Sequence, residues 1–553
     1  MPKLPKKACS NISYLLPTNA EYARLINEVS KMGIYVNPNN DGLKQALNSK
    51  IYVDKSGIIE ITNNLLDTEQ NCMCISRPRR FGKSMGINLL IAYYSKGCNS
   101  RDLFANLKIS KNPDFEKHLN KYNVIWLNLP KFKELGSKIE ELLPTMIEEL
   151  KRELKEEFPQ YIESISRPLQ LILSDIYKQT HEKFIVLIDE WDYIFRESTN
   201  TKLQEEYVDF LRALFKDSPF IKLAYITGIL PVKRYNTQSA LNNFIEYSMT
   251  IPRNMAEYFG FTEDEVKILC KKFNRDFDEI KAWYDGYLMP GNLHIYNPCS
   301  VVQSMDGGKL QGYWVATSSF EALRIPINLN INGIRESVLE MMGGARIMAD
   351  VSDFQCDTEA IESRDQALAL LVHLGYLAYD EENEEVFIPN REIKGEFDKS
   401  IKLSEWKEVI RALNNSDTLL KATWNGDENA VAKYIEQAHQ DISSILGYNN
   451  EETLRSVVSI AYYTAIRFYQ FIKEFPSGKG FADMVFLPYK HVNKPLIVVE
   501  LKKNNTAESA IAQIKEKNYS ESLQKYSGDI LLVGITYDDD KKHYCKIEHI
   551  TKL

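Results

Sequence analysis

One stretch of thirteen residues, 72–84, constrains the fold of this chain more than any other. It begins with short apolar residues, as in a buried strand, and the residues after Gly82-Lys83-Ser84 have helical character. A strand, a tight loop ending in Gly-Lys-Ser and a helix form the context in which backbone N–H groups face a phosphate. Lys83 would then add a positive charge near the β- and γ-phosphates, and Ser84 would present its hydroxyl to Mg²⁺. The stretch therefore predicts a phosphate-binding loop, although Arg77 stands where the first glycine of the usual pattern would be.

A second stretch, residues 184–188, is a continuous apolar run that ends in Asp189-Glu190. A buried parallel strand with a carboxylate at its C-terminal end places that carboxylate where ligands bind in open α/β sheets. We expect Asp189 to hold the Mg²⁺ that Ser84 also contacts, and Glu190 to orient and deprotonate a water aimed at the γ-phosphate. The alternative is a strand that simply ends in a charged turn, which is common for one acidic residue but not for two.

Further apolar runs complete a nucleotide-binding domain. Residues 123–129 and 221–226 have the composition of buried strands, and residues 247–251 are a candidate fifth strand. Thr227, at the end of 221–226, would lie beside the γ-phosphate and sense it. Together these runs predict a doubly wound domain over about residues 45–251.

The composition limits what else the chain can be. At 553 residues it is too long for a single core, and its length suggests roughly three or four domains. The net charge is −8, from 68 basic and 76 acidic residues, so any contact with nucleic acid must use a local basic patch. Eight cysteines without a C-x-x-C pattern indicate reduced thiols, and no apolar run is long enough to span a bilayer or form a signal peptide. We therefore expect a cytoplasmic protein with no membrane contact.

The C-terminal part of the chain carries a second group of charged residues. Residues 481–487 and 496–502 have the pattern of two strands, and alternation along the second places Glu500 and Lys502 on one face. If the strands pair as a hairpin, Asp483 lies beside Glu500. Two adjacent carboxylates attract a divalent cation, and a neighbouring lysine positions a water and offsets charge on a phosphate. The alternative is a surface hairpin whose charges are only solvated.

Basic residues gather around this hairpin, as expected of a surface that neutralises a phosphate backbone without reading its sequence. They are Lys490, His491, Lys494, Lys502, Lys503, Lys515 and Lys517. A lysine-rich rim is also an ordinary solubility feature, so the cluster is supporting evidence only.

The whole chain divides into five parts. They are a polar lead-in (1–44), the P-loop domain (45–251), a mostly helical lid (252–345), a winged-helix-like and linker region (346–440) and the C-terminal domain (441–553). In the fourth part a helix over 367–374 precedes a hairpin whose acidic turn would repel a phosphate backbone, so we interpret it as structural or regulatory. Residues 411–430 are the predicted loosest connection.

Several motifs of this chain occur in the same order in a known family. They are Tyr52-Val53-Asp54-Lys55-Ser56, Arg77-Pro78-Arg79-Arg80-Phe81-Gly82-Lys83-Ser84, Thr227-Gly228-Ile229-Leu230, Trp283-Tyr284-Asp285-Gly286-Tyr287, Tyr296-Asn297-Pro298, Tyr313-Trp314 and Thr317-Ser318. With them the chain resembles the AAA-ATPase-like proteins fused to a PD-(D/E)XK nuclease-like domain, from about residue 45 almost to the C-terminus. That family has an R-P-R-R loop in place of a glycine-rich one, so Arg77 does not indicate that the phosphate-binding motif has been lost.

The resemblance implies an α/β protein with a P-loop NTPase sheet, a helical lid, a winged-helix-like middle region and a C-terminal PD-(D/E)XK nuclease-like α/β domain. It implies ATP and Mg²⁺ as cofactors, with Arg79, Arg80 and Phe81 joining the loop residues named above. The spacing Asp483-x16-Glu500-x-Lys502 matches the nuclease pattern, with the two carboxylates as metal ligands. Ala510, Gln513 and Tyr519 fit the helix that follows in that family, which adds Gln513 to the catalytic residues.

We therefore expect ATP binding and hydrolysis coupled to metal-dependent cleavage of nucleic acid, DNA rather than RNA. The chain has no guanine-reading N-K-x-D pattern, which favours ATP over GTP. The aromatic residues of Y-D-G-Y and Y-N-P are expected to pack rather than to contact nucleotide. Two alternatives stay open: an ATP-driven switch whose nuclease-like domain binds without cutting, and a nuclease whose P-loop domain is only a platform. A homo-oligomer is also compatible with the sequence.

Overall fold

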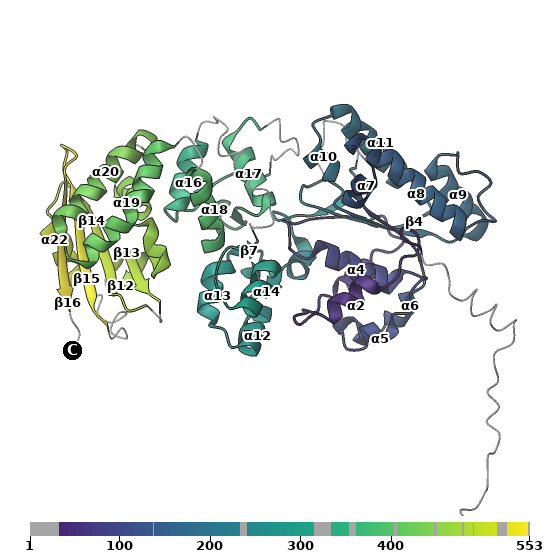
Figure 1. The fold of residues 1–553 in the computed structure, drawn as a ribbon, viewed down its shortest axis with the longest axis horizontal. Coiled ribbons are helices and arrows are strands. Elements are labelled where there is room, and N and C mark those ends of the chain that lie inside the picture. Colours follow the sequence, from purple (N-terminus) through teal and green to yellow (C-terminus); the bar gives the residue numbers. More distant parts are fainter. Residues whose placement is uncertain are drawn as a thin grey trace, which may run out of the picture.

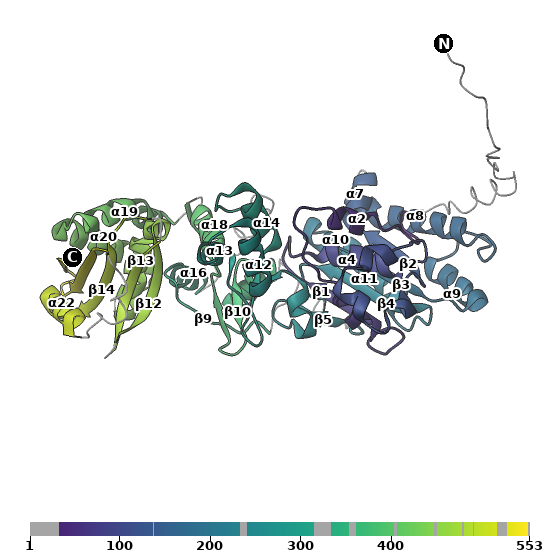
Figure 2. The same ribbon diagram turned by 90° about the horizontal axis from the view of Figure 1, so that it is seen from below.

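The computed structural model describes residues 33–136, 138–232, 241–314, 333–352, 361–402, 406–446, 451–477, 480–489, 492–516 and 528–550. Figure 1 shows an N-terminal α/β part at one end, the C-terminal sheet at the other end and two smaller regions between them. The view from below in Figure 2 shows the same row of parts. Most of the predicted lead-in, together with Thr317, Ser318, Lys490, His491, Lys517 and Tyr519, lies outside the described residues.

The N-terminal part is built on a five-stranded parallel sheet with the order β2-β3-β4-β1-β5. Its strands are β1 (Cys72–Ser76), β2 (Asn123–Asn128), β3 (Phe184–Asp189), β4 (Ile221–Gly228) and β5 (Ile245–Tyr247). Because all the strands run in one direction, their C-terminal ends meet at one edge. β4 lies between β1 and β3, so its end separates the loop after β1 from the carboxylates after β3. The predicted doubly wound sheet is confirmed.

The fifth strand is displaced from its predicted position. β5 ends at Tyr247, and the following residues form a turn in which the Ser248 amide donates to the Ile251 carbonyl at 3.0 Å. Pro252 comes next and cannot donate to a strand ladder. The predicted strand 247–251 is therefore wrong beyond its first residue.

Helices cover both faces of this sheet because its strands are apolar on both sides. Ile185 and Leu187 of β3 pack with α4 (Lys83–Tyr94), whereas Val186 and Ile188 pack with α8 (Leu142–Glu157) and α11 (Thr201–Phe215). Figure 1 shows the two helical layers on opposite sides of β4. The other elements of this part are α2 (Asp41–Leu47), α3 (Ile58–Asn63), α5 (Arg101–Phe104), η1 (Lys108–Lys111), α6 (Phe115–His118), α7 (Leu129–Leu135), η2 (Ile139–Glu141), α9 (Leu169–Thr180) and α10 (Tyr193–Glu197).

The predicted lid contains a small sheet that the sequence did not indicate. Its strands, in the order β6-β8-β7, are β6 (Phe261–Thr262), β7 (Tyr287–Met289) and β8 (Leu293–Tyr296). They accompany η3 (Arg253–Tyr258), α12 (Glu263–Phe273), α13 (Phe277–Tyr284), α14 (Pro298–Gly307) and α16 (Ile334–Met342). The tyrosines of Y-D-G-Y and Y-N-P end or begin these short elements, and Tyr284, Tyr287 and Tyr296 are fully buried. Their burial is the packing role that the sequence favoured.

The next region has the predicted helix and hairpin. α17 (Arg364–Leu374) precedes β10 (Ala378–Asp380) and β11 (Glu385–Phe387), β9 (Ile347–Met348) adds a third strand, and α18 (Arg391–Lys402) follows. Arg346 pairs with Asp380 at 2.6 Å and lies 3.8 Å from Glu385, so two carboxylates of this hairpin have a cation beside them.

The predicted loosest connection, residues 411–430, is wrong. α19 (Lys407–Trp424) and α20 (Glu428–Leu446) form an antiparallel pair joined by a short turn at Gly426, which has φ 70°. Leu419, Leu420 and Val431 are buried in the core that these helices share with the C-terminal sheet. The predicted domain boundary at 440/441 falls inside α20; the remaining division of the chain stays a prediction.

The C-terminal sheet has five strands in the order β12-β13-β14-β15-β16, and only the pair β14 and β15 is parallel. They are β12 (Tyr469–Ser477), β13 (Gly480–Pro488), β14 (Leu496–Lys503), β15 (Ile530–Tyr537) and β16 (His543–Ile550). One face packs with α19, α20, α21 (Glu451–Ala461) and η5 (Tyr463–Arg467), and the other with α22 (Ala507–Glu516). Ile497 and Val499 point to the first face, Leu496 and Val498 to the second.

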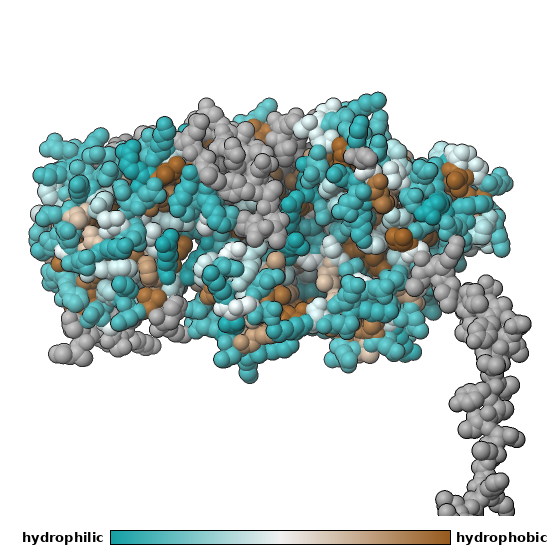
Figure 3. Space-filling view, viewed as in Figure 1, coloured by the Kyte–Doolittle hydropathy of each residue, from teal (hydrophilic) through white to brown (hydrophobic). Residues whose placement is uncertain are grey.

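The face in Figure 3 is mostly hydrophilic, with small hydrophobic areas separated from one another. Among the residues that the structure describes, no helix is both long and apolar enough to cross a membrane.

Candidate functional site

The loop between β1 and α4 turns through two left-handed residues. Arg80 has φ 67° and Gly82 has φ 92°. Glycine adopts this conformation freely, whereas another residue pays about 1–2 kcal/mol for it. α4 begins directly after the loop at Lys83, so the first amides of the helix face the same edge of the sheet.

Lys83 is buried inside this loop. Its Nζ donates to the carbonyls of Arg77 at 2.8 Å and Pro78 at 2.9 Å. Burial lowers the pKa of Lys83 to about 8, and the carboxylates of Asp192 and Asp189 oppose that shift. The ammonium group thus has neutral partners that an anionic ligand can replace.

Asp189 collects donors from three neighbouring elements. Ser84 Oγ at the start of α4 donates to Oδ2 at 2.6 Å, and Thr227 Oγ1 at the end of β4 donates to Oδ1 at 2.5 Å. The amide of Asn128, at the end of β2, donates to Oδ2 at 3.3 Å. The sheet register produces this convergence, because Asn128 and Thr227 are the strand partners of Asp189 on its two sides.

Glu190 follows Asp189 in the chain, and its side chain is partly exposed to solvent. It has φ 55°, and its side chain is 39% exposed, whereas Asp189 is 2% exposed. Arg196 of α10 donates to Glu190 Oε2 at 2.6 Å and holds the carboxylate in place. Asp192 is fully buried and accepts from the backbone amides of Ile229 and Leu230. The geometry therefore favours Glu190 over Asp192 as the group that reaches a water.

These residues line a cavity of about 560 Å³. Its wall includes Arg79, Arg80, Gly82, Lys83, Ser84, Asp189, Glu190, Tyr193 and Arg196. Phe81 is not part of this wall: it is buried and stacks edge-on to Tyr287, with ring centroids 5.2 Å apart. Thr227 contacts Asp189 from behind rather than lining the cavity.

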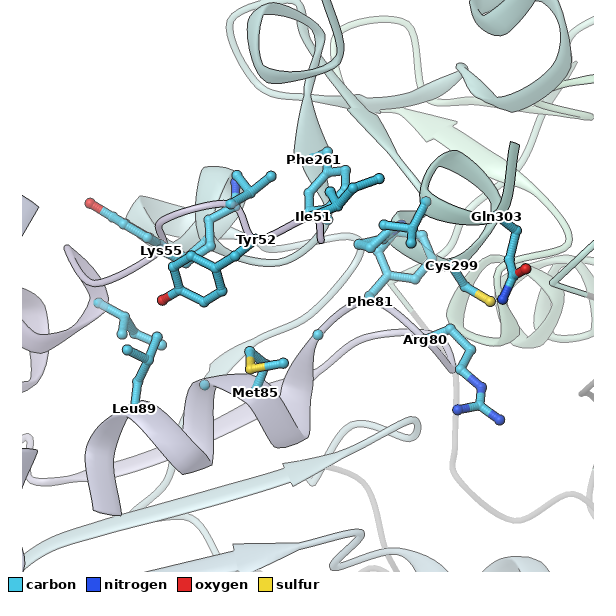
Figure 4. Close-up of a pocket in the computed structure, with 18 residues that line it drawn as sticks. Ile51, Tyr52, Lys55, Arg80, Phe81, Met85, Leu89, Phe261, Cys299 and Gln303 are labelled. Carbon is cyan, nitrogen blue, oxygen red and sulfur yellow. The ribbon is translucent and has the colours of Figure 1, made fainter. Parts of the chain in front are cut away.

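A second, more apolar pocket of about 340 Å³ shares Arg80, Gly82 and Met85 with the first. Figure 4 shows Tyr52 opposite Met85 and Leu89, Phe81, Phe261 and Cys299 beside them, and the guanidinium of Arg80 directed away. The pocket joins the motif at residues 52–56 to α4, β6 and α14. Lys55 links the 52–56 motif to η3 and α12, because its Nζ donates to the Glu257 carbonyl and to Glu265 Oε2, both at 2.6 Å.

The C-terminal carboxylates come together on β13 and β14. The ladder between these antiparallel strands ends at the pair Met484 and Val499, and Asp483 and Glu500 are the residues directly beyond that pair. Asp483 Oδ2 accepts from the Leu501 amide at 2.8 Å, and Glu500 is 1% exposed. Lys502 Nζ lies 3.8 Å from Glu500 Oε1. The predicted juxtaposition of the three residues is therefore present.

Two family models match the chain at these two places. Residues 44–237 match the model described as predicted AAA-ATPase, and residues 449–547 match that of the PD-(D/E)XK nuclease superfamily. The chain thus joins an AAA-ATPase-like domain to a PD-(D/E)XK nuclease-superfamily domain. A relative in Azotobacter chroococcum mcd 1, described as an uncharacterized protein in the vnfD 5′ region, is 23% identical over 526 residues, which are 89% of this chain and 93% of the relative.

Three solved structures show weak similarity. The Walker-type ATPase of Pyrococcus abyssi has a TM-score of 0.31 and 12% identity, and the match covers 62% of this chain and 94% of that one. The Aeropyrum pernix ORC2 protein with ADPNP and ADP has a TM-score of 0.23 and 10% identity, covering 63% and 93%. The Aeropyrum pernix ORC1 protein in complex with DNA has 0.21 and 11%, covering 82% and 94%. With such scores, these structures carry no argument about this chain.

The nuclease-superfamily domain contains a charge that the sequence did not indicate. Arg455 of α21 donates through Nη2 to Asp483 Oδ1 at 2.8 Å. Both oxygens of this aspartate therefore have donors, one of them fully charged. The sequence predicted a helix there but offered no pattern that linked it to the hairpin.

Gln513 and the lysine cluster are less closely tied to this site. Gln513 lies half-buried on α22, and among the described side chains no hydrogen bond joins it to Asp483, Glu500 or Lys502. α22 reaches the sheet over Gly534, the strand partner of Glu500, where an added Cβ would lie 2.5 Å from the Ala507 carbonyl. Two of the predicted phosphate-binding lysines are engaged elsewhere, since Lys494 lies over the Trp424 ring at 3.8 Å and Lys515 pairs with Glu548.

In the AAA-ATPase-like domain, the residues missed by sequence reasoning are Asn128 and Arg196. A polar residue at the C-terminal end of an apolar strand is the signal that would have identified Asn128, because Asp189 and Thr227 were found in the same way. Arg196 lies six residues after Glu190, beyond the motif, and has no such signal.

Proposed function

We propose that the AAA-ATPase-like domain binds ATP with Mg²⁺ and hydrolyses it. The observation that supports this most is the 2.6 Å contact between Ser84 Oγ and Asp189 Oδ2 at the cavity that Lys83 also lines. A hydroxyl and a carboxylate oxygen at this spacing form a donor set that suits Mg²⁺. Bound there, Mg²⁺ would supply positive charge to the β- and γ-phosphate oxygens.

Phosphate binding, proton acceptance and the positioning of the metal ligand are assigned to residues of the chain as follows. Lys83 exchanges its two carbonyl partners for phosphate oxygens, and the amides at the start of α4 face the same anion. Glu190, oriented by Arg196, accepts a proton from the water that attacks the γ-phosphate. Thr227 fixes the carboxylate of Asp189 from behind. The apolar pocket beside Met85 is placed to receive the base.

For the C-terminal domain we propose metal-dependent cleavage of nucleic acid, DNA in preference to RNA. Asp483 and Glu500 offer the oxygen ligands that a divalent cation takes, and Lys502, on the same strand face as Glu500, would position the attacking water. Gln513 would support the site from α22. A cation at Asp483 would compete with the guanidinium of Arg455 for Oδ1.

The ion pair between Arg455 and Asp483 supports a second candidate function. If Arg455 holds Asp483 permanently, the domain binds nucleic acid or a partner without cutting, and the chain is an ATP-driven switch. The ion pair is the specific observation in its favour, because it neutralises the aspartate without a metal.

One experiment separates these functions. The purified full chain is incubated with labelled duplex DNA, single-stranded DNA or RNA, with Mg²⁺ or Mn²⁺, and with or without ATP, while phosphate release is measured in the same tube. Cleavage with ATP turnover supports the first function. Binding that weakens steeply with salt, together with ATP turnover and no cleavage under any condition, supports the switch.

The nucleotide site has its own test. Lys83→Ala removes the charge that meets the phosphates and is expected to abolish ATP binding measured by calorimetry. The matched control is Lys202→Ala, an exposed lysine on α11, which should bind as the parent does. In the parent chain GTP should compete poorly with ATP, and equal affinity for the two would overturn the expected preference for adenine.

A further inference from the structure

The phosphate-binding loop of this chain lacks glycines before Gly82. From Arg77 to Phe81 it consists of large residues and one proline, and Arg80 has a left-handed backbone. A non-glycine residue keeps such a conformation only where the surrounding structure holds it. The loop therefore needs anchors outside itself.

Two anchors come from beyond the parallel sheet. Trp314 Nε1 donates to the Arg79 carbonyl at 2.9 Å, and the Gly260 amide donates to the Phe81 carbonyl at 3.0 Å. These two carbonyls bracket the strained residue Arg80. Trp314 is 1% exposed, so its indole is a fixed part of the interior.

The anchors determine where the loop amides point. In a trans peptide the carbonyl and the following N–H point in opposite directions. The Arg79 carbonyl faces Trp314, so the Arg80 N–H points away from Trp314, and by the same reasoning the Gly82 N–H points away from Gly260. Arg80 and Gly82 line the phosphate cavity, and neither anchor does. The anchors thus keep the Arg80 and Gly82 amides on the side away from Trp314 and Gly260, in two residues that line the phosphate cavity.

Trp314 is itself held by a buried carboxylate. Glu392 of α18 is 3% exposed, and its Oε1 accepts from the amides of Tyr313 at 2.6 Å and Trp314 at 2.8 Å. Its Oε2 accepts from Ser300 Oγ of α14 at 2.7 Å. Burial raises the pKa of Glu392, and these donors oppose the shift. One side chain therefore connects α18, α14 and the segment that carries the indole.

The end of α17 also contacts the loop. At Gly375, which has φ 87°, an added Cβ would lie 2.7 Å from Pro78 Cβ. The Gly375 carbonyl accepts from the Tyr287 hydroxyl at 2.7 Å, and Tyr376 packs against Trp314 with ring centroids 5.3 Å apart. The motifs Tyr313-Trp314 and Y-D-G-Y thus meet at one contact with the loop.

We propose that Trp314 is a positioning residue of the nucleotide site, which sets the loop amides for phosphate binding, and that Glu392 keeps it in place. The inference rests on the proposed binding of ATP at this loop. If Trp314 and Glu392 have these roles, phosphate affinity depends on residues that lie outside the parallel sheet and do not line the phosphate cavity.

The test compares Mg-ATP with inorganic tripolyphosphate, which has no base. Trp314→Phe keeps an aromatic ring and removes only the N–H donor. Loss of one hydrogen bond predicts about threefold to tenfold weaker binding of both ligands. The matched control is Trp424→Phe, which removes an indole donor to the Tyr469 hydroxyl in the other half of the molecule and should leave both affinities unchanged.

Glu392 provides the second pair of variants. Glu392→Leu removes the acceptor for the Trp314 amide and should weaken tripolyphosphate binding as Trp314→Phe does. Glu392→Gln keeps a carbonyl oxygen for the two amides and should restore affinity close to that of the parent. A role in stability alone would lower the melting temperature of the ligand-free chain without this pattern of phosphate affinities.

The outcomes are distinct. If the parent chain binds neither ligand, the proposed nucleotide function falls, and this inference falls with it. If the parent binds both and folded Trp314→Phe binds them equally well, only the inference is overturned. Weaker binding of both ligands by Trp314→Phe and Glu392→Leu, with rescue by Glu392→Gln, supports it.

Discussion

The two charged sites of this chain differ in what holds their central aspartate. In the AAA-ATPase-like domain Asp189 accepts from neutral groups, which are two hydroxyls and an amide. In the nuclease-superfamily domain Asp483 pairs with the guanidinium of Arg455. A cation that approaches Asp189 displaces neutral donors, whereas one that approaches Asp483 competes with a full positive charge.

The same contrast holds for the two lysines. Among the described residues, Arg77 and Pro78 supply the carbonyls to which Lys83 Nζ donates, and a phosphate can replace these neutral acceptors with anionic ones. Lys502 already lies 3.8 Å from the carboxylate of Glu500. A phosphate would thus replace neutral hydrogen-bond partners of Lys83, whereas Lys502 already has a carboxylate nearby. Membership in a nuclease superfamily does not decide activity, since function depends on the site rather than the fold.

The largest expected effect tests whether the sites work separately. Glu190→Gln keeps ATP binding but removes the acceptor of the water proton, so ATP turnover should fall by about 10²-fold or more. Lys502→Met should stop cleavage of labelled DNA to a similar extent and leave ATP turnover unchanged. Phosphate release and strand cleavage are measured on both variants.

Exposed residues of the same type, outside both sites, serve as controls. Glu205→Gln lies on the exposed side of α11, and Lys421→Met changes an exposed lysine of α19 that pairs with Asp417. Glu205→Gln should leave ATP turnover unchanged, and Lys421→Met should leave DNA cleavage unchanged. Full ATP turnover by Glu190→Gln would exclude Glu190 as the base and return Asp192 to consideration.

The sequence predicted those parts of the two sites that a local pattern carries. Lys83 and Ser84 belong to one strand-loop-helix, and Asp189 ends an apolar run, so spacing and hydrophobicity were sufficient to find them. The strand periods also predicted that Glu500 and Lys502 share a face. Their contacts depend on backbone geometry that such patterns encode directly.

Other residues escaped because their contacts join distant segments. Trp314 lies 235 residues from Arg79, and Arg455 lies 28 residues from Asp483 on a different element. No periodicity links such pairs, since tertiary packing alone brings them together. The helices α19 and α20 were missed for a different reason: Asn414, Asn415, Ser416 and Asp417 favour turns locally, and apolar burial along the helix outweighs that preference.

An intermediate effect tests the charge difference itself. Arg455→Ala removes the guanidinium that competes for Asp483, so Mn²⁺ should bind the C-terminal site about tenfold more tightly, or about 1.4 kcal/mol. Mn²⁺ titration followed by electron paramagnetic resonance measures this, in a Lys83→Ala background that suppresses nucleotide-linked binding. The control Arg411→Ala breaks a similar ion pair with Asp441 away from the site. Unchanged or weaker Mn²⁺ binding by Arg455→Ala would mean that the arginine does not oppose the metal.

The smallest expected effect concerns the proton on Lys83. Its pKa is lowered to about 8 by burial, so the ligand-free site loses the positive charge as the pH rises through that value. Bound phosphate favours the charged form and raises the pKa, so the complex keeps its proton over a range in which the free site does not. ATP affinity should therefore fall on the alkaline side, by about fourfold between pH 7 and pH 8.5 for a pKa of about 8. Terminal phosphates lose their last proton at about pH 6, so ATP itself changes little across this range. Calorimetry at several pH values measures the decline, and Lys83→Arg should lack it because a guanidinium stays charged. Mn²⁺ binding at the C-terminal site does not involve Lys83, and a parallel decline there would show that the pH dependence comes from another group.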